Sequence, residues 1–267
     1  VLILSGDHIY KMDYARMIER HKQTGAACTI AAIRVPLSDA SRFGILNTDE
    51  EGTIYQYEEK PKQPKSDLAS MGIYVFSADK LYRYLEEDEK DPASQKDFGK
   101  NVLPAMLAAG EKMVSYLFNG YWRDVGTISS LYESNMDLLG ESPKFDIADE
   151  AWRIRSRNPI APPQFIASGC EIDGTVENCI LSNNVTVKTG AVVKNSIVFS
   201  GTVIGEGSVI ENSIVDENVS VGKACRIGEC KDKTKKIAVL GRDISVSDHS
   251  VIPDGAMVDC DVKGGEQ

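Results

Sequence analysis

The segment VTVKTGAVVKNSIVFSGTVIGEGSVIENSIVDENVSVGKACRI, residues 185–227, contains the clearest periodicity in the chain. A small aliphatic side chain recurs there at every sixth position: Val185, Ala191, Ile197, Val203, Val209, Val215, Val221 and Ile227. A period of six fits neither an α-helix nor a hairpin sheet. It is typical of a parallel β-helix, in which each short strand forms one side of a triangular coil. We therefore expect these side chains to point into a narrow prism; chance spacing in a β-sandwich is the alternative.

The pattern changes on both sides of this segment. The period is interrupted near 231–236 and resumes weakly at Ile244, Val251 and Met257. Residues 140–163 contain four prolines among charged residues, which favours a linker. Before them, strand-like and helix-like segments alternate, which predicts an α/β layer structure. The sequence therefore predicts an α/β part at 1–139, a linker at 140–163 and a β-helix at 164–267.

Within the α/β part, apolar runs and turn residues predict the individual elements. The expected strands are 1–4, 27–35, 45–47, 53–57, 72–76 and 113–118, and the expected helices are 13–25, 80–87, 98–109 and 127–139.

Composition excludes several classes of protein. The chain has 267 residues and a formal net charge of -10, so it has no general attraction for nucleic acid or for anionic membranes. The sequence shows no signal peptide and no apolar run long enough to span a bilayer. Its six cysteines lack the spacing of a zinc site, and we expect them to be reduced thiols in a cytoplasmic protein.

The chain begins with Val1-Leu2-Ile3-Leu4 rather than with Met. A continuous apolar run is expected of a strand buried on both faces, and a protein rarely begins inside such a strand. The sequence therefore predicts that the chain is a fragment. One flank of residues 1–4 would then carry unpaired backbone groups and uncovered apolar side chains, which favour aggregation.

Two carboxylates follow predicted strands and precede turns. Asp7 lies in Ser5-Gly6-Asp7, directly after the first strand, and Asp124 precedes Gly126 and Thr127 at a helix entry. Ligands bind at the carboxyl ends of strands in open α/β sheets, and two carboxylates can share one Mg²⁺ there. The alternative for both residues is capping of the following turn or helix.

Further polar and glycine positions are candidates for a binding site. Glu59-Lys60 ends a strand, where a carboxylate can bind sugar hydroxyls and an ammonium can neutralise a phosphate. Gly44 and Gly72 lie where a backbone approaches a ligand or a neighbouring strand. Asp97 is a candidate too, although it could simply cap a helix. A charged strand exit is likewise the plain alternative for Glu59 and Lys60.

Taken in order, the motifs resemble those of one enzyme family, the glucose-1-phosphate adenylyltransferases (ADP-glucose pyrophosphorylases). They are SGDHIYKMDY (5–14), RFGI (42–45), EEKP (58–61), ASMGIY (69–74), DFGK (97–100) and YWRDVGT (121–127), followed by RNP (157–159) and PPQFI (162–166). The resemblance covers essentially the whole chain. It implies a partial Rossmann-like nucleotidyltransferase sheet followed by a left-handed parallel β-helix of hexapeptide repeats. It also implies synthesis of ADP-glucose and pyrophosphate from ATP and glucose 1-phosphate, in glycogen or starch biosynthesis.

The resemblance implies a role for each candidate residue. Asp7 and Asp124 hold Mg²⁺ and, with Lys60, make up the catalytic set. Glu59 and Ser70 bind the glucose hydroxyls, and Lys60 meets the sugar phosphate. The glucose 1-phosphate site as a whole is Gly44, Glu59, Lys60, Ser70, Asp97 and Trp122. The sugar phosphate would attack the α-phosphorus of ATP in line, with no covalent enzyme intermediate.

One feature of the family is missing from the chain. The glycine-rich loop with arginine that cradles the triphosphate is absent, so the ATP site is undefined and we expect the chain alone to be inactive. Alternatives are a pyrophosphorylase for another sugar or nucleotide, a silent regulatory subunit, and a hexapeptide-repeat acyltransferase that uses His249. The family is typically tetrameric and allosteric, which implies a homotetramer or a heterotetramer with a related subunit. Effector candidates are Arg153, Arg155 and Arg157.

Overall fold

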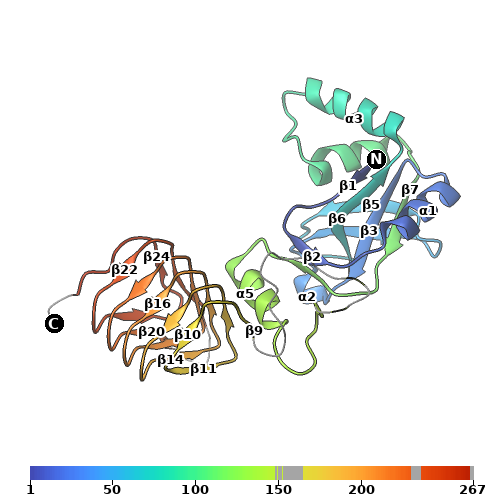
Figure 1. Ribbon diagram of the computed structural model, residues 1–267. Helices are drawn as coiled ribbons and strands as arrows, with labels where there is room; N and C mark the ends of the chain where they lie inside the picture. The colour runs from blue at the N-terminus through green and yellow to red at the C-terminus, as the bar shows by residue number, and fades with distance from the viewer. Residues whose placement is uncertain (148, 150–151, 153–164, 230–235, 265–267) are drawn as a thin grey trace. The chain divides into compact units, whose positions relative to one another are not determined.

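The structure is a computed structural model that describes residues 1–147, 149, 152, 165–229 and 236–264. The chain divides into two compact units, Val1–Trp122 and Arg123–Gln267 (Figure 1). The first is an α/β unit and the second contains the coil of short strands. Most of the predicted linker, including the effector candidates Arg153, Arg155 and Arg157, lies outside the described residues.

The α/β unit contains most of the elements that the sequence predicts. They are β1 (Leu2–Ile3), β2 (His8–Tyr10), α1 (Tyr14–Thr24), β3 (Cys28–Arg34), α2 (Leu37–Ala40), β4 (Gly44–Thr48), β5 (Ile54–Glu59), β6 (Leu68–Phe76), α3 (Ala78–Lys90), the π-helix η1 (Phe98–Val102), α4 (Leu103–Ala108), β7 (Met113–Leu117) and β8 (Trp122–Asp124), whose last two residues belong to the second unit. The sequence did not predict β2, α2 or β8, and β6 begins four residues before the expected position 72.

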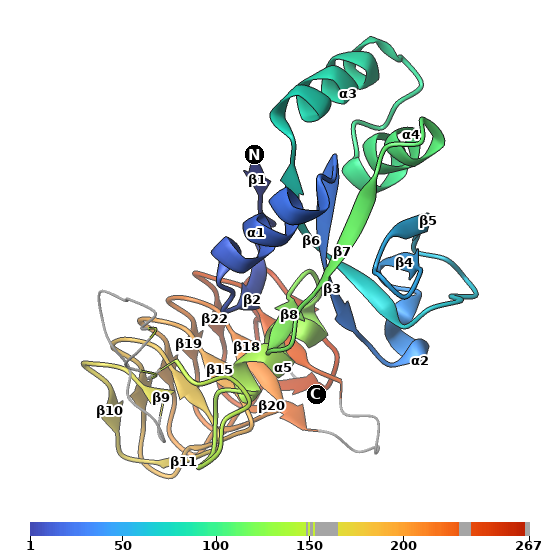
Figure 2. The ribbon, with the colours of Figure 1, turned by 90° about the vertical axis from the view of Figure 1, so that its right-hand side faces the viewer.

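The central sheet has the strand order β5-β4-β6-β3-β7, with β1 also paired to β6. Only β3 and β7 are parallel; the other neighbours are antiparallel. Side chains alternate across a strand, so Ile30 and Ala31 belong to different cores. One core packs α3, η1 and α4 on the sheet, and the other packs α1 through Met17. Figure 2 shows α1 and α4 on opposite sides of the strands.

Local sequence explains how α1 is bounded. Asp13 accepts a hydrogen bond from the backbone N–H of Ala15 at 3.0 Å, and the helix ends at Gly25 in the left-handed conformation. Both features were predicted. The Asp49–Gly52 turn likewise joins β4 and β5, since the N–H of Asp49 donates to the carbonyl of Thr53 at 3.0 Å.

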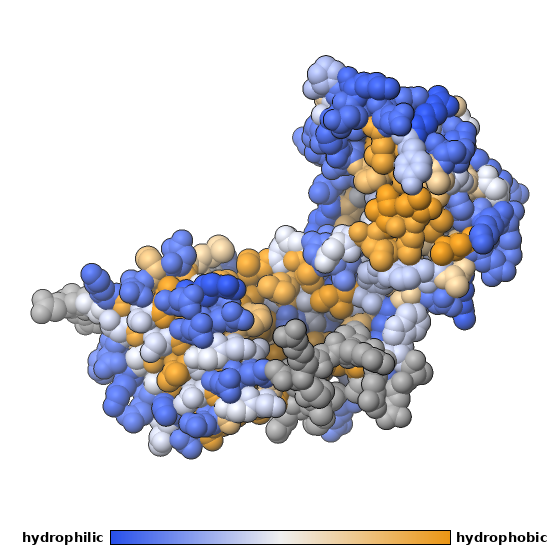
Figure 3. Space-filling model, turned by 45° about the horizontal axis from the view of Figure 1, so that its top comes forward, coloured by the Kyte–Doolittle hydropathy of each residue, from blue (hydrophilic) through white to orange (hydrophobic). Residues whose placement is uncertain are grey.

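The first strand is shorter and more exposed than a strand of a sheet interior. Only Leu2 and Ile3 pair with β6, opposite Val75 and Tyr74. The side chains of Val1 and Leu4 are 47% and 44% exposed. Figure 3 shows apolar side chains gathered on one face of this unit. The two ends of the predicted strand are therefore exposed, while Leu2 and Ile3 are half-buried, and the expectation that the chain is a fragment stays a prediction.

The second unit contains α5 (Ile128–Met136) and a coil of short parallel strands. The strands are β9 (Phe165–Ile166), β10 (Glu171–Ile172), β11 (Thr175–Glu177), β12 (Ile180–Leu181), β13 (Thr186–Val187), β14 (Val192–Lys194), β15 (Ile197–Val198), β16 (Val203–Ile204), β17 (Val209–Glu211), β18 (Ser213–Val215), β19 (Ser220–Val221), β20 (Arg226–Glu229), β21 (Ala238–Leu240), β22 (Ser245–Val246), β23 (Val251–Pro253) and β24 (Met257–Val258). They form three sheets, β10-β13-β16-β19-β22, β11-β14-β17-β20-β23 and β24-β21-β18-β15-β12-β9. Three stacked parallel sheets are consistent with the expected left-handed β-helix.

The repeat of the coil corrects the expected period. Val192 pairs with Val209 and Ile197 with Ile214, so one turn contains 17 residues rather than three hexads. A strict period of six therefore slips by one residue per turn. The interior positions follow steps of six, six and five residues: Leu181, Val187, Val193, Val198, Ile204, Ile210, Val215, Val221 and Ile227.

Several of the expected interior positions are therefore wrong. Val203 and Val209 are only half-buried, while their neighbours Ile204 and Ile210 are fully buried. Val251 and Met257 are 67% and 72% exposed. In each case the slipped register places the expected residue beside the true interior position or on the outer face.

The outer face of one sheet carries its own apolar cluster. Ile197 and Ile214 pack there with Leu131 and Met136 of α5, and the Tyr132 hydroxyl donates to the carbonyl of Asn195 at 2.6 Å. Contacts thus group α5 with the coil, although the sequence assigned it to the α/β part. The boundary at residue 139 remains a prediction, because much of the linker is not described. No helix among the described residues is long and apolar enough to cross a membrane.

Candidate active site

The structure brings together three of the residues predicted to bind the sugar. Gly44 and Glu59 are direct partners across β4 and β5. Gly99, two residues after Asp97, packs against Glu59, because a Cβ atom at position 99 would lie 2.5 Å from Glu59 Oε2. The segment that contains Asp97 therefore faces the end of β5, where Gly44 and Glu59 lie.

Two tyrosines that were not among the predicted site residues, Tyr57 and Tyr74, complete this cluster. We call it the sugar cluster: Gly44, Tyr57, Glu59, Tyr74 and residues 97–99. Tyr57 donates a hydrogen bond to Glu59 Oε2 at 2.8 Å. Burial raises the pKa of Tyr57 well above its usual value, and the neighbouring Tyr74 and Glu59 add to this effect. Burial likewise raises the pKa of Tyr74 to about 12, and a hydrogen bond with Ser70 opposes the increase. Both phenols are therefore protonated near neutral pH, and they lie beside carboxylates.

Ser70 lies on β6 next to a distorted stretch of the strand. It is 7% exposed, and its hydroxyl oxygen accepts the N–H of Gly72 at 3.4 Å. Gly72 has a φ of 65°, and a Cβ atom there would lie 3.4 Å from His8 Cε1. The glycine thus supplies a left-handed conformation and a close approach to His8, the first residue of β2.

Lys60 follows directly on β5 in an unusual conformation. Its φ is 47°, and its N–H donates to the carbonyl of Phe43 at 3.1 Å. The ammonium lies 3.9 Å from Glu59 Oε1, and the side chain is 65% exposed. A cation beside a carboxylate, with access to solvent, is suited to bind a phosphorylated sugar.

Asp7 and Trp122 are connected through His8. Asp7 Oδ1 accepts the hydroxyl of Ser5 at 2.9 Å and lies 3.7 Å from His8 Nε2. The indole N–H of Trp122 donates to His8 Nδ1 at 3.3 Å, and its ring meets that of Phe43 at 5.4 Å between centroids. Because Phe43 adjoins Gly44 and its carbonyl holds Lys60, this group borders the sugar cluster. The Asp7 carboxylate is 58% exposed.

Asp124 ends β8, two residues after Trp122, and makes a local contact of its own. Its Oδ1 accepts the N–H of Gly126 at 2.9 Å. The cap of α5 is Thr127, which forms a capping box with Ser130. Asp124 is therefore not the helix cap. Asp97, in contrast, caps η1 by accepting the N–H of Lys100 at 3.0 Å, so its local alternative role is real.

An ion cluster lies beside Asp124 in the second unit. The neighbouring Arg123 donates through Nε to Asp137 Oδ2 at 3.0 Å, and the Lys144 ammonium donates to Asp137 Oδ1 at 2.7 Å. The Asp137 carboxylate is 6% exposed. This cluster ties the strand end that carries Asp124 to the end of α5.

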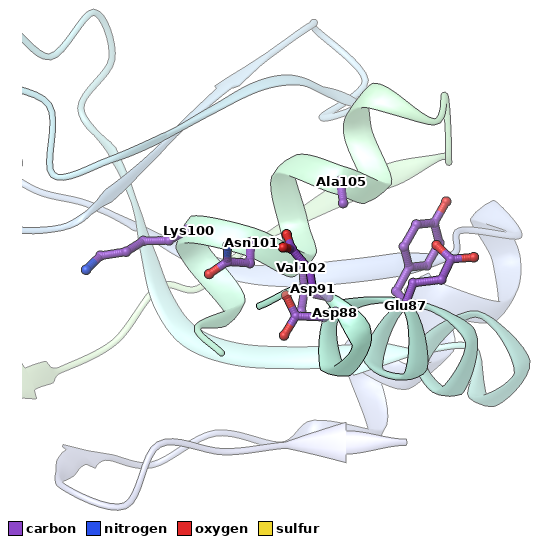
Figure 4. A pocket seen from close by; sticks show the side chains of 8 residues that line it. Glu87, Asp88, Asp91, Lys100, Asn101, Val102 and Ala105 are labelled. Carbon is purple, nitrogen blue, oxygen red and sulfur yellow. The ribbon is translucent and has the colours of Figure 1, made fainter. Parts of the chain in front are cut away.

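The hollow in Figure 4 is separate from these residues. It lies between α3 and η1 and holds a volume of about 260 Å³. Its lining includes Glu87, Asp88 and Asp91, and Asp88 Oδ1 accepts the hydroxyl of Ser94. Lys100 points away from these carboxylates, and its ammonium donates to Gln95 Oε1 at 2.8 Å. No residue that we predicted for the active site lines this hollow.

His249, the candidate base of an acyltransferase, lies at a corner of the coil. Its φ is 61°, and positive φ values also occur at the equivalent corner positions of the three preceding turns, Ala224, Gly207 and Gly190. The side chain is exposed. The coil therefore requires a positive φ at this corner whichever residue occupies it. This favours a structural role for His249.

Known protein families identify the chain as a nucleotidyl transferase. Residues 1–141 match the family described as nucleotidyl transferase, and residues 154–263 match the GMPPB C-terminal domain. Glucose-1-phosphate adenylyltransferase of Clostridium perfringens (strain SM101 / Type A) is 50% identical over 269 residues, which cover 97% of this chain and 69% of that protein. The enzyme of the same name from Desulforamulus reducens is 44% identical over 281 residues, 99% of this chain and 69% of its own.

A third relative, from Clostridium acetobutylicum, carries the same name and is 54% identical over 187 residues, which cover 69% of this chain and 49% of that protein. The chain therefore belongs to the glucose-1-phosphate adenylyltransferase family of nucleotidyl transferases. The resemblance inferred from the motifs is confirmed. The role of each site residue remains a prediction.

Proposed function

We propose that the protein forms ADP-glucose and pyrophosphate from ATP and glucose 1-phosphate. The observation that carries this proposal is the identity to enzymes named for this reaction along nearly the whole chain. The geometry agrees with it, since Gly44, Glu59 and the Asp97 segment converge beside the cation of Lys60. A sugar requires hydroxyl-binding carboxylates, and a sugar phosphate also requires a cation.

In this proposal, Glu59 and Ser70 bind the glucose hydroxyls and Lys60 meets the phosphate. Asp97 and Trp122 line the site, and Gly44 allows close approach of the backbone. The phenols of Tyr57 and Tyr74 lie beside these carboxylates and stay protonated. These residues orient the sugar phosphate for attack on the α-phosphorus of ATP. Catalysis is then a matter of position and charge rather than of a covalent intermediate.

Nucleotidyltransferases of this kind generally use a divalent metal, and we propose that it is Mg²⁺ held by Asp7 and Asp124. Among the described residues, Asp7, His8 and Asp124 are a group that could hold a metal ion. Carboxylate oxygens are the protein ligands that Mg²⁺ prefers, and the exposure of Asp7 leaves room for substrate phosphates. When bound, the metal would neutralise charge on those phosphates.

The assay for this function is pyrophosphate release by the intact enzyme. ATP, GTP, UTP and dTTP are each supplied with glucose 1-phosphate and Mg²⁺, and initial rates are compared. We expect ATP to be preferred by more than about tenfold, because binding sites built to hydrogen-bond one base discriminate strongly against others. Preference for another nucleotide would assign the protein to a different pyrophosphorylase.

We propose that the protein works in the cytoplasm. The five described cysteines are free thiols, which suits a reducing compartment such as the cytoplasm. A tetramer, either of identical chains or with a related subunit, follows from the family resemblance alone. Size-exclusion chromatography with light scattering would test the oligomeric state.

A further inference from the structure

Tyr57 has no role in the proposed chemistry, yet it lies at the centre of the sugar cluster. Side chains alternate along β5, so Tyr55, Tyr57 and Glu59 share one face of the strand. The Tyr57 hydroxyl donates to Glu59 Oε2 at 2.8 Å. The other carboxylate oxygen, Oε1, lies 3.9 Å from the ammonium of Lys60. The two oxygens of Glu59 therefore have different neighbours.

Two glycines provide the space for this hydrogen bond. A Cβ atom at Gly99 would lie 2.5 Å from Glu59 Oε2 and 2.8 Å from the Tyr57 hydroxyl. A Cβ atom at Gly44 would lie 3.0 Å from Glu59 Oε2 and would overlap the Tyr57 phenol. Neither glycine has a positive φ, so the backbone does not require glycine at either position. What excludes a larger residue is the paired phenol and carboxylate.

The environment keeps the phenol in the state that donates. Burial is the largest cause of the raised pKa of Tyr57, and Tyr74 and Glu59 contribute to it. The proton therefore stays on Tyr57 throughout the neutral range, and Glu59 is the acceptor. A donor fixed in this way limits the rotamers that the Glu59 carboxylate can adopt.

We propose that Tyr57 is a positioning residue that holds the Glu59 carboxylate for the sugar hydroxyls, in a space kept open by Gly44 and Gly99. This rests on the proposed role of Glu59 in binding glucose 1-phosphate. Tyr57 acts through Glu59. A carboxylate oriented before the sugar arrives loses less conformational freedom on binding. Loss of the hydrogen bond should therefore weaken sugar binding without changing the nucleotide site.

The first test is Tyr57→Phe in the intact enzyme, with Tyr55→Phe as the matched control. Tyr55 lies on the same face of the strand but is 68% exposed. We expect Tyr57→Phe to raise the KM for glucose 1-phosphate about tenfold, as for a hydrogen bond to a charged group. The KM for ATP should stay within about twofold. Tyr55→Phe should match the wild type in both constants, and thermal melting should show both variants folded.

Glu59→Gln separates the positioning role of Tyr57 from the sugar-binding role of Glu59. If it raises the KM for glucose 1-phosphate while Tyr57→Phe leaves that KM unchanged, the positioning role is overturned and the proposed role of Glu59 stands. If Glu59→Gln itself has no effect on that KM, both are overturned. Calorimetric titration with glucose 1-phosphate gives the same comparison without turnover.

Gly99→Ala provides a second variant that leaves the phenol in the chain. The added methyl group would most closely meet the ends of the Tyr57 and Glu59 side chains rather than any backbone atom, so we expect a folded protein in which these ends are displaced and the KM for glucose 1-phosphate is raised. Because both changes act through the orientation of Glu59, the double variant Tyr57→Phe with Gly99→Ala should show less than the product of the single effects. Independent, multiplicative effects would contradict the proposal.

Discussion

Replacement of Lys60 by alanine and by glycine separates its charge from its backbone conformation. The ammonium lies 3.9 Å from Glu59 Oε1, with the side chain 65% exposed, and the backbone φ is 47°. Both substitutions remove the charge that we propose meets the sugar phosphate. Only glycine also removes the steric conflict of a left-handed backbone conformation.

The expected loss of affinity follows from the exposure of the side chain. A hydrogen bond to a charged group contributes roughly 1.5–3 kcal/mol, and solvent screening favours the lower end of this range for a largely exposed lysine. A loss of about 1.5–2 kcal/mol corresponds to a rise of roughly 10- to 30-fold in the KM for glucose 1-phosphate. Without the lysine, the negative charge of Glu59 would also raise the KM for glucose 1-phosphate. The KM for ATP should change by less than about threefold.

The expected effect on stability differs between the two variants. A non-glycine residue in the left-handed region costs about 1–2 kcal/mol, while glycine costs about 0.5–1 kcal/mol of chain entropy on folding. The glycine variant should therefore be more stable than the alanine variant by about 0.5–1 kcal/mol. Thermal melting of the two proteins under the same conditions measures this difference.

The two variants together test the assignment of the phosphate site. Steady-state kinetics with each substrate varied in turn should show the same glucose 1-phosphate defect in both. A defect confined to ATP would mean that Lys60 faces the other substrate. Recovery of glucose 1-phosphate affinity in Lys60→Gly, relative to Lys60→Ala, would mean that the backbone rather than the ammonium determines binding.

Two further predictions concern the metal and the coil. Asp7→Asn and Asp124→Asn should each lower kcat at least about a hundredfold if the metal stabilises the developing charge. Near-normal kcat in either variant would contradict a metal-binding role for that carboxylate. In the coil, Ile210→Ala should destabilise the protein by about 2–5 kcal/mol, whereas Val209→Ala should cost less than about 1 kcal/mol. Equal losses in urea denaturation would contradict the 17-residue register.

The architecture of the coil was predictable from the sequence, but its register was not. Aliphatic residues occupy adjacent positions in many strands, as at Val203-Ile204 and Val209-Ile210. The aliphatic pattern therefore fits both a strict period of six and a turn of 17 residues. A better signal lay at the corners. Asn178, Asn195 and Asn212 all have positive φ and are spaced by one 17-residue turn. Asparagine tolerates this conformation better than most residues, so its spacing reports the length of the turn.

The candidate site residues were predictable only where a motif contained them. Tyr57 lies in no motif that was singled out, and its role depends on contact between β5 and η1, which are about 40 residues apart in the sequence. Sequence spacing contains no information about such a contact. Asp97 shows the converse problem, since it caps η1 and also lies beside the cluster. A local role and a chemical one are compatible in the same side chain.

Backbone strain distinguishes Lys60 from the other residues in the left-handed region. Within the α/β unit, whose residues are all described, the non-glycine residues with positive φ are Lys60 and Lys96. Lys96 has a structural reason for its conformation, because its ammonium donates to the backbone carbonyls of Asp88 and Asp91 and closes the end of α3. Lys60 directs its ammonium into solvent beside Glu59 instead. Stability alone would favour glycine at position 60, so the backbone strain there supports the proposed role of the lysine charge, as expected of strain held at a binding site.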